Sequence, residues 1–125
     1  TLDSYGAGRG LNLIPDAHAR FIRGCRDFFE TETHIFVHAN YDRWLPMDRT
    51  GGTRLRWEFL EPHRQCPHVS GKRVVVGHTP QMSDEVLDLG FLVRIDTDCS
   101  RGGWLTAIEA RSSSIVQANQ ADRLR

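Results

Sequence analysis

The stretch KRVVVGHTPQ, residues 72–81, decides how this chain folds. Its three consecutive valines favour a β-strand that is buried on both faces, because β-branched side chains pack well in a covered sheet. Gly77 permits a sharp turn, and Pro80 prevents the strand from continuing. The pattern therefore predicts that His78 lies at the carboxyl end of a buried strand, where open α/β sheets bind their ligands.

A second histidine stands in the same setting. The run HIFVHA, residues 34–39, predicts a short strand, and His38 comes directly after its apolar residues. If the two strands are neighbours, both imidazoles project from one edge of the sheet. Imidazole is the commonest side-chain metal ligand, because it is neutral near pH 7 and offers a directional lone pair. His38 and His78 are therefore candidate metal ligands, with a purely structural role as the alternative for each.

The remaining pattern predicts an α+β fold, in which a mixed β-sheet packs with helices. Apolar residues recur at helical spacing through residues 14–30, and residues 53–61 suggest a short helix that ends before Pro62. Five or six strands are expected in all. The later ones are two hairpins, residues 85–90 with 91–97 and residues 104–110 with 114–118.

Composition narrows the class of protein. The 125 residues suit one domain, and 16 basic side chains balance 16 acidic ones, so neither nucleic acid nor a membrane is predicted as a partner. No apolar run approaches the roughly 20 residues of a spanning helix, and no signal peptide is recognisable. Cys25, Cys66 and Cys99 are odd in number and widely spaced, which favours free thiols and a cytoplasmic location.

Three further segments carry possible ligands, but a structural role suits each of them better. Asp96 follows a strand and could be a third metal ligand, whereas the turn DTDCSRGG favours a capping carboxylate. HRQCPH, residues 63–68, holds nitrogen and sulfur donors at a spacing that matches no zinc finger, so a polar loop is expected. GAGRG, residues 6–10, lacks the preceding strand that a phosphate-binding loop requires.

Arginines and tryptophans complete the set of candidates. Arg54 and Arg56 are surface charges by default, but an arginine beside a metal site is well shaped to bind phosphate through two hydrogen bonds. The three indoles are expected to be packing residues whose N–H groups find partners at the rim: Trp44, Trp57 and Trp104.

Three segments, in this order, resemble one enzyme family: FVHAN, GKRVVVGHTPQ and IDTDCSRGGWLTAIEA. They are similar to the C-terminal half of the calcineurin-like metallophosphoesterases of the phosphoprotein phosphatase (PPP) group. That group includes serine/threonine protein phosphatases and bacterial diadenosine tetraphosphatases. The resemblance covers nearly the whole chain. It implies a four-layer α/β/β/α sandwich, of which residues 1–125 form the C-terminal part of a single domain.

The resemblance also implies chemistry. Family members hold two divalent metal ions, usually manganese, iron or zinc, and the bridging hydroxide attacks phosphorus without a covalent enzyme intermediate. By position, His38 and His78 resemble the two histidines that hold the second metal. The implied substrates are phosphoproteins or nucleotides.

The sequence departs from the family in several places. The motifs GDxHG, GDxVDRG and GNHE, which supply the other metal ligands and the acid histidine, are absent, so no catalytic residue is assigned and the piece alone is expected to be inactive. Asn40 and Asp98 each replace a usual glycine. Phe59 stands where the family has a phosphate-binding arginine, which leaves Arg54 or Arg56 as possible substitutes.

Three functions therefore stay open at this point. The first is hydrolysis of phosphoserine or phosphothreonine, and the second is hydrolysis of a dinucleoside polyphosphate. The third is a non-catalytic module, or one half of an assembly that another chain completes. Half a sandwich exposes apolar sheet surface, so self-association is expected as well.

Overall fold

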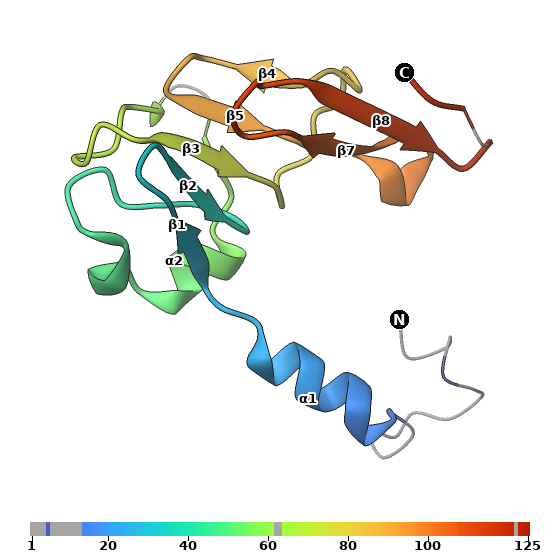
Figure 1. The fold of residues 1–125 in the computed structure, drawn as a ribbon, viewed down its shortest axis with the longest axis horizontal. Coiled ribbons are helices and arrows are strands. Elements are labelled where there is room, and N and C mark those ends of the chain that lie inside the picture. The colour runs from blue at the N-terminus through green and yellow to red at the C-terminus, as the bar shows by residue number, and fades with distance from the viewer. Residues whose placement is uncertain (1–4, 6–13, 62–63, 122) are drawn as a thin grey trace.

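The computed structural model describes residue 5 and residues 14–61, 64–121 and 123–125 (Figure 1). The GAGRG segment and His63 lie outside the described residues. Eight strands and two α-helices fall within the described part, so the α+β class is confirmed. No helix in these ranges is long and apolar enough to cross a membrane.

The larger sheet has five strands in the order β1-β2-β3-β5-β4. Its centre is parallel, since β3 pairs in parallel with both β2 and β5, and the outer strands β1 and β4 run antiparallel to their neighbours. This is the mixed sheet that the sequence predicts. The strands are β1 (Phe28–Glu30), β2 (His34–Val37), β3 (Arg73–Val76), β4 (Leu87–Asp88) and β5 (Leu92–Arg94).

The smaller sheet is an antiparallel meander of β6 (Asp96–Thr97), β7 (Trp104–Ile108) and β8 (Ile115–Asn119). The prediction of one strand over residues 91–97 is wrong, because the chain passes from one sheet to the other there. The Ile95 amide still donates to the Val76 carbonyl at 2.9 Å, whereas Asp96 already pairs with Leu105. An alternation of period two does not reveal such a change of sheet.

The first helix is shorter than predicted. α1 (Asp16–Gly24) ends at a glycine, the residue that weakens helices most after proline. Phe28 and Phe29 instead form β1, where they pair with Val37 and Phe36 of β2. α1 has no buried residue and extends away from the sheets (Figure 1).

The second helix, α2 (Gly52–Trp57), lies within the predicted short helix. It covers one face of the larger sheet, where Leu55 joins the core. Two 3₁₀ turns complete the structure, η3 (Met47–Arg49) and η5 (Cys99–Arg101). The core is formed by alternate residues of β2, β3 and β5 together with residues of the segment that follows β2: Ile35, Val37, Val74, Val76, Leu92, Tyr41, Met47, Leu55 and Leu60.

All three valines of the opening stretch, Val74, Val75 and Val76, are buried, as predicted. β3 is therefore covered on both faces, and its carboxyl end is held in one place. This end carries the residues of the candidate site.

Candidate metal centre

The two strand-end histidines lie side by side. β2 and β3 are adjacent parallel strands with Val37 opposite Val76, so both strands end at the same edge of the sheet. His38 Nε2 lies 3.1 Å from His78 Nδ1, and the two ring centroids are 4.9 Å apart. The structure thus brings together the two residues that the sequence singles out.

The turn after β3 is made by His78 itself. Its φ is +63°, in the left-handed region that favours glycine, whereas Gly77 is not among the residues with positive φ. The Gly77 amide donates to the His38 carbonyl at 2.9 Å, which ties the two histidine segments together. The sharp turn expected at Gly77 is therefore made one residue later, and the strained backbone belongs to the candidate ligand.

The surroundings of His78 fix its tautomer. His78 Nε2 lies 3.1 Å from the Trp57 carbonyl oxygen, which can only accept, so Nε2 carries the hydrogen. In the neutral ring, Nδ1 then holds the lone pair, and it faces His38. Phe59 packs on the same ring with centroids 5.0 Å apart. Metal-binding histidines typically donate their second N–H to such a carbonyl.

Electrostatics favour a neutral His38. Partial burial lowers the pKa of His38 most, the neighbouring His78 lowers it further, and the carboxylate of Asp96 raises it in part. A histidine binds metal through its neutral form. The lowered pKa therefore keeps His38 neutral at neutral pH, and without a metal ion its Nε2–H donates to His78 Nδ1.

The geometry of the pair fits a shared cation. Two imidazole nitrogens that each bind one metal ion at about 2.1 Å lie roughly 3.0–3.4 Å apart, depending on the coordination angle. The observed 3.1 Å falls in this range. Within the described ranges, however, no three His, Cys, Asp or Glu residues form a cluster that could hold a metal ion. A complete centre would need further ligands beyond this pair.

Asp96 has a structural role as well as an electrostatic one. Its Oδ1 accepts the Asp98 amide at 3.2 Å, which caps the turn as predicted. Both carboxylate oxygens of Asp98 in turn accept from Arg101 Nε at 2.9 and 3.0 Å. Asp98 itself has φ +62°, so an aspartate adopts the left-handed conformation in this turn.

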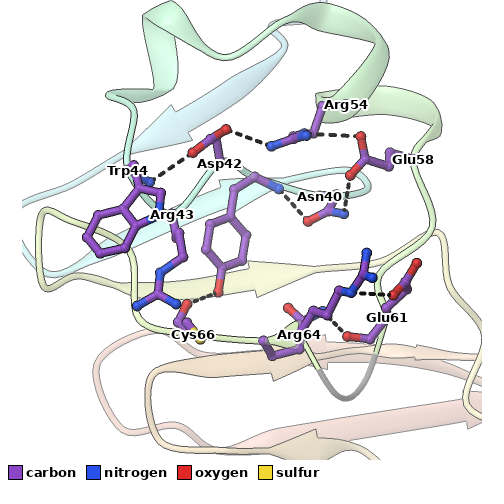
Figure 2. Close-up of a pocket in the computed structure, with 11 residues that line it drawn as sticks. Asn40, Asp42, Arg43, Trp44, Arg54, Glu58, Glu61, Arg64 and Cys66 are labelled. Carbon is purple, nitrogen blue, oxygen red and sulfur yellow. Dashed lines mark hydrogen bonds and ion pairs between the residues drawn. The ribbon is translucent and has the colours of Figure 1, made fainter.

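The two candidate phosphate-binding arginines lie in separate places. Arg54 pairs with Asp42 at 2.7 Å and with Glu58 at 3.0 Å, in a pocket that Asn40 also lines (Figure 2). Arg56 pairs with Asp27, away from that pocket. Carboxylates hold both guanidinium groups. Of the two arginines, Arg54 lines the pocket that also contains Asn40, which comes two residues after His38 in the sequence.

The HRQCPH segment behaves as a structural loop in its described part. His68 is buried, with Nδ1 2.7 Å from Ser70 Oγ and Nε2 2.9 Å from the Leu45 carbonyl oxygen, so both ring nitrogens are occupied. The carbonyl of Cys66 accepts the Tyr41 hydroxyl at 2.7 Å. The three cysteines are free thiols, as predicted.

The tryptophans differ from the prediction. Trp44 and Trp57 are each 69% exposed, so they are not packing residues. Trp104 is half-buried, and the Arg125 guanidinium lies 4.2 Å from its ring centroid. Residue type alone does not show which indole faces solvent.

Sequence reasoning missed Arg94, which is 4% exposed at the end of β5. Its Nη2 donates to the Thr79 carbonyl at 3.2 Å, and the Gln81 side-chain oxygen, in the orientation that satisfies its hydrogen bonds, accepts from Arg94 Nε at 2.6 Å. Arg94 thus anchors the loop that carries His78. A charged residue inside the apolar run FLVRI is the signal that could have revealed it.

The sequence matches no protein-family model and no curated relative. Any assignment of function therefore rests on the residues and their geometry.

Proposed function

We propose that this chain is the C-terminal part of a PPP-type metal-dependent phosphoesterase that acts in the cytoplasm on phosphomonoesters of serine or threonine. The observation that supports this most directly is the 3.1 Å separation of His38 Nε2 and His78 Nδ1 at the ends of adjacent parallel strands. The ordered motifs described above, two of which contain these histidines, support it as well.

In this proposal, His38 and His78 hold one of two divalent ions, manganese, iron or zinc. A bound ion would lower the pKa of its water toward about 7, and so would supply a hydroxide nucleophile. The Trp57 carbonyl orients His78, and Arg94 holds the loop on which it lies. Arg54 and Arg56 are the candidates for contacting the phosphate. The remaining ligands, and the other layers of a four-layer sandwich, would come from a half with the GDxHG, GDxVDRG and GNHE motifs.

The metal role is tested by titrating the chain with Mn²⁺ in a calorimeter. We expect weak binding with one ion per chain, and we expect His38→Ala and His78→Ala each to abolish it. The matched control is His18→Ala, because His18 is exposed on α1. Binding that persists in the double variant would reject the metal role of this pair.

Catalysis is tested after joining the chain to a half that carries the missing motifs. We expect a chromogenic phosphate ester to be hydrolysed at saturating Mn²⁺, and we expect loss of either histidine to remove most of the turnover. Unchanged turnover would show that these histidines do not serve the reaction.

A second candidate function keeps the enzyme class and changes the substrate to a dinucleoside polyphosphate. The segment DTDCSRGGWLTA favours it, because this segment resembles the diadenosine tetraphosphatase branch. Rates on diadenosine tetraphosphate and on a phosphopeptide separate the two.

The third candidate is a non-catalytic module, or half of a two-chain assembly, and the absent ligand motifs favour it. A chain of this kind would bind a partner through its exposed sheet and would bind Mn²⁺ no better than the double histidine variant does.

A further inference from the structure

A polar pocket of about 280 Å³ begins at Asn40, two residues after His38 (Figure 2). The two segments that form much of its wall, residues 40–44 and 54–58, also border the histidines. The side-chain amide of Asn40 donates to the Phe59 carbonyl at 3.3 Å, and the Phe59 ring packs on His78. Asn40 and Phe59 thus connect the pocket wall to the histidine pair.

Most charges in the pocket are already paired. Arg54 is held by Asp42 at 2.7 Å and by Glu58 at 3.0 Å, and the Asn40 amide donates to Glu58 at 3.1 Å. On the opposite wall, Arg64 pairs with Glu61 at 3.2 Å. These ion pairs give the pocket a polar lining that has no excess of positive charge.

Arg43 is the exception. Its guanidinium lies 4.4 Å from the ring centroid of Trp44, and its Nε is buried without a hydrogen-bond partner among the described residues. No carboxylate of the described residues forms an ion pair with it. Stacking on an indole occupies the face of a guanidinium and leaves its edge donors directed outward in one plane. Because Nε is buried, only the terminal Nη groups of Arg43 are left to meet a ligand, beside the exposed indole of Trp44.

We propose that this pocket is a recognition subsite for an acidic peptide. The carboxylate of an aspartate or glutamate binds the two terminal Nη groups of Arg43, one hydrogen bond from each, and the adjoining peptide packs on Trp44. If the histidine pair receives a phosphorylated residue, as the proposed function has it, the pocket selects substrates with an acidic residue close to that phosphate.

The charge balance favours a peptide over a polyphosphate. The pocket is lined by the three carboxylates of Asp42, Glu58 and Glu61, which repel a ligand that carries several negative charges. Among the described lining residues three guanidinium groups balance these three carboxylates, and Arg43 is the guanidinium outside the ion pairs, so it matches a single carboxylate. The exposed indole then provides apolar contact area that a peptide uses readily.

The subsite is tested by binding, without turnover. The intact chain is titrated with phosphoserine peptides in which a single aspartate is moved along either side of the phosphoserine, and with the same peptides lacking phosphate. The indole N–H signal of Trp44, assigned by comparison with Trp44→Phe, reports occupation by NMR. We expect this signal to shift for peptides with the aspartate at one or two positions, with or without phosphate.

Substitution of Arg43 supplies the decisive comparison. Arg43→Met keeps an aliphatic stem on Trp44 and removes the donors, so affinity for the preferred acidic peptide should fall about 10-fold or more. Arg43→Lys should restore only part of it, because an ammonium lacks the two-pronged edge. The matched control is Arg49→Met, since Arg49 is exposed and outside the pocket, and it should leave affinity unchanged.

Two results would overturn the subsite. One is equal affinity of the Arg43→Met and Arg49→Met variants for the acidic peptide, with circular dichroism showing that both are folded. The other is a Trp44 shift that depends on Arg43 with diadenosine tetraphosphate and is absent with every peptide. Because neither readout uses metal or hydrolysis, failure of the subsite is distinguishable from failure of the proposed phosphoesterase activity.

Discussion

The phenol of Tyr41 is buried behind the pocket, where it donates to the Cys66 carbonyl at 2.7 Å. Burial, with a smaller contribution from Cys66, raises the pKa of Tyr41 to about 12 from 10.0. Below pH 10 the phenol is protonated in both the folded and the unfolded chain, so its stabilising contribution is fully present. Between pH 10 and 12 the unfolded chain loses this proton while the folded chain keeps it.

The free energy of unfolding should therefore fall by about 1.4 kcal/mol per pH unit over this window through Tyr41 alone. Urea unfolding of the wild type and of Tyr41→Phe at several pH values measures it, because the variant lacks the group. Parallel curves for the two proteins between pH 10 and 12 would contradict the assignment.

Arg94 supports the second prediction for a single residue. Replacing it with methionine, which is similar in length, removes the hydrogen bonds to Thr79 and Gln81 and leaves those acceptors without a partner in a partly buried site. We expect a loss of about 1–3 kcal/mol in the free energy of unfolding, and weaker Mn²⁺ binding because the His78 loop is less well held. Arg49→Met is the control, and equal stability of the two variants would count against this role of Arg94.

The sequence alone predicts the position of some residues in the fold and not of others. The positions of His38 and His78 were predictable, since strand length and the rule for parallel sheets bring both to one edge. The left-handed backbone of His78 was not predictable, because the neighbouring Gly77 is the residue that would normally be expected to adopt such a conformation. Nor were the exposure of Trp44 and the burial of Arg94, which depend on contacts with segments distant in the chain.

At the scale of elements, the connection between β6 and β7 depends on Gly103. A Cβ at this position would lie 2.1 Å from the Thr97 carbonyl oxygen, a backbone atom that cannot move without disturbing β6. Gly103→Ala should therefore destabilise the smaller sheet, with a loss of about 2–4 kcal/mol on unfolding. Gly24→Ala is the control, because a Cβ there meets nothing within 4 Å. Thermal unfolding measures both, and equal melting temperatures would contradict the prediction.

Sequence periodicity located most elements but did not set all their ends. The hairpin of β7 and β8 follows the predicted runs, because its alternation continues on both sides of the turn at residues 111–113. The predicted end of α1 was too late, because residues 25–30 continue the helical pattern of apolar side chains. In the structure residues 28–30 pair with β2 instead. The division between β5 and β6 was missed because the alternation of side chains continues unchanged where the chain passes from one sheet to the other.

For the whole molecule, the most consequential surface is an apolar hollow of about 530 Å³, lined mainly by residues of β1, β2 and β3. Phe29, at this surface, is 61% exposed. Apolar patches of this kind favour association. We expect sedimentation to show self-association that increases with concentration, and Phe29→Ser to weaken it.

The control for self-association is Phe21→Ser, because Phe21 is 75% exposed on α1, outside the hollow. A wild-type chain that remains monomeric at high concentration would reject the prediction. An equal effect of both variants would place the contact elsewhere than on β1.

The left-handed backbone at His78 also bears on how this protein would change under selection. Glycine would adopt that conformation with about 1 kcal/mol less strain. A laboratory evolution experiment that rewards only heat resistance should therefore exchange this imidazole early. If the proposed metal site is real, lineages that must also retain metal would keep the strained residue and gain their tolerance at other positions.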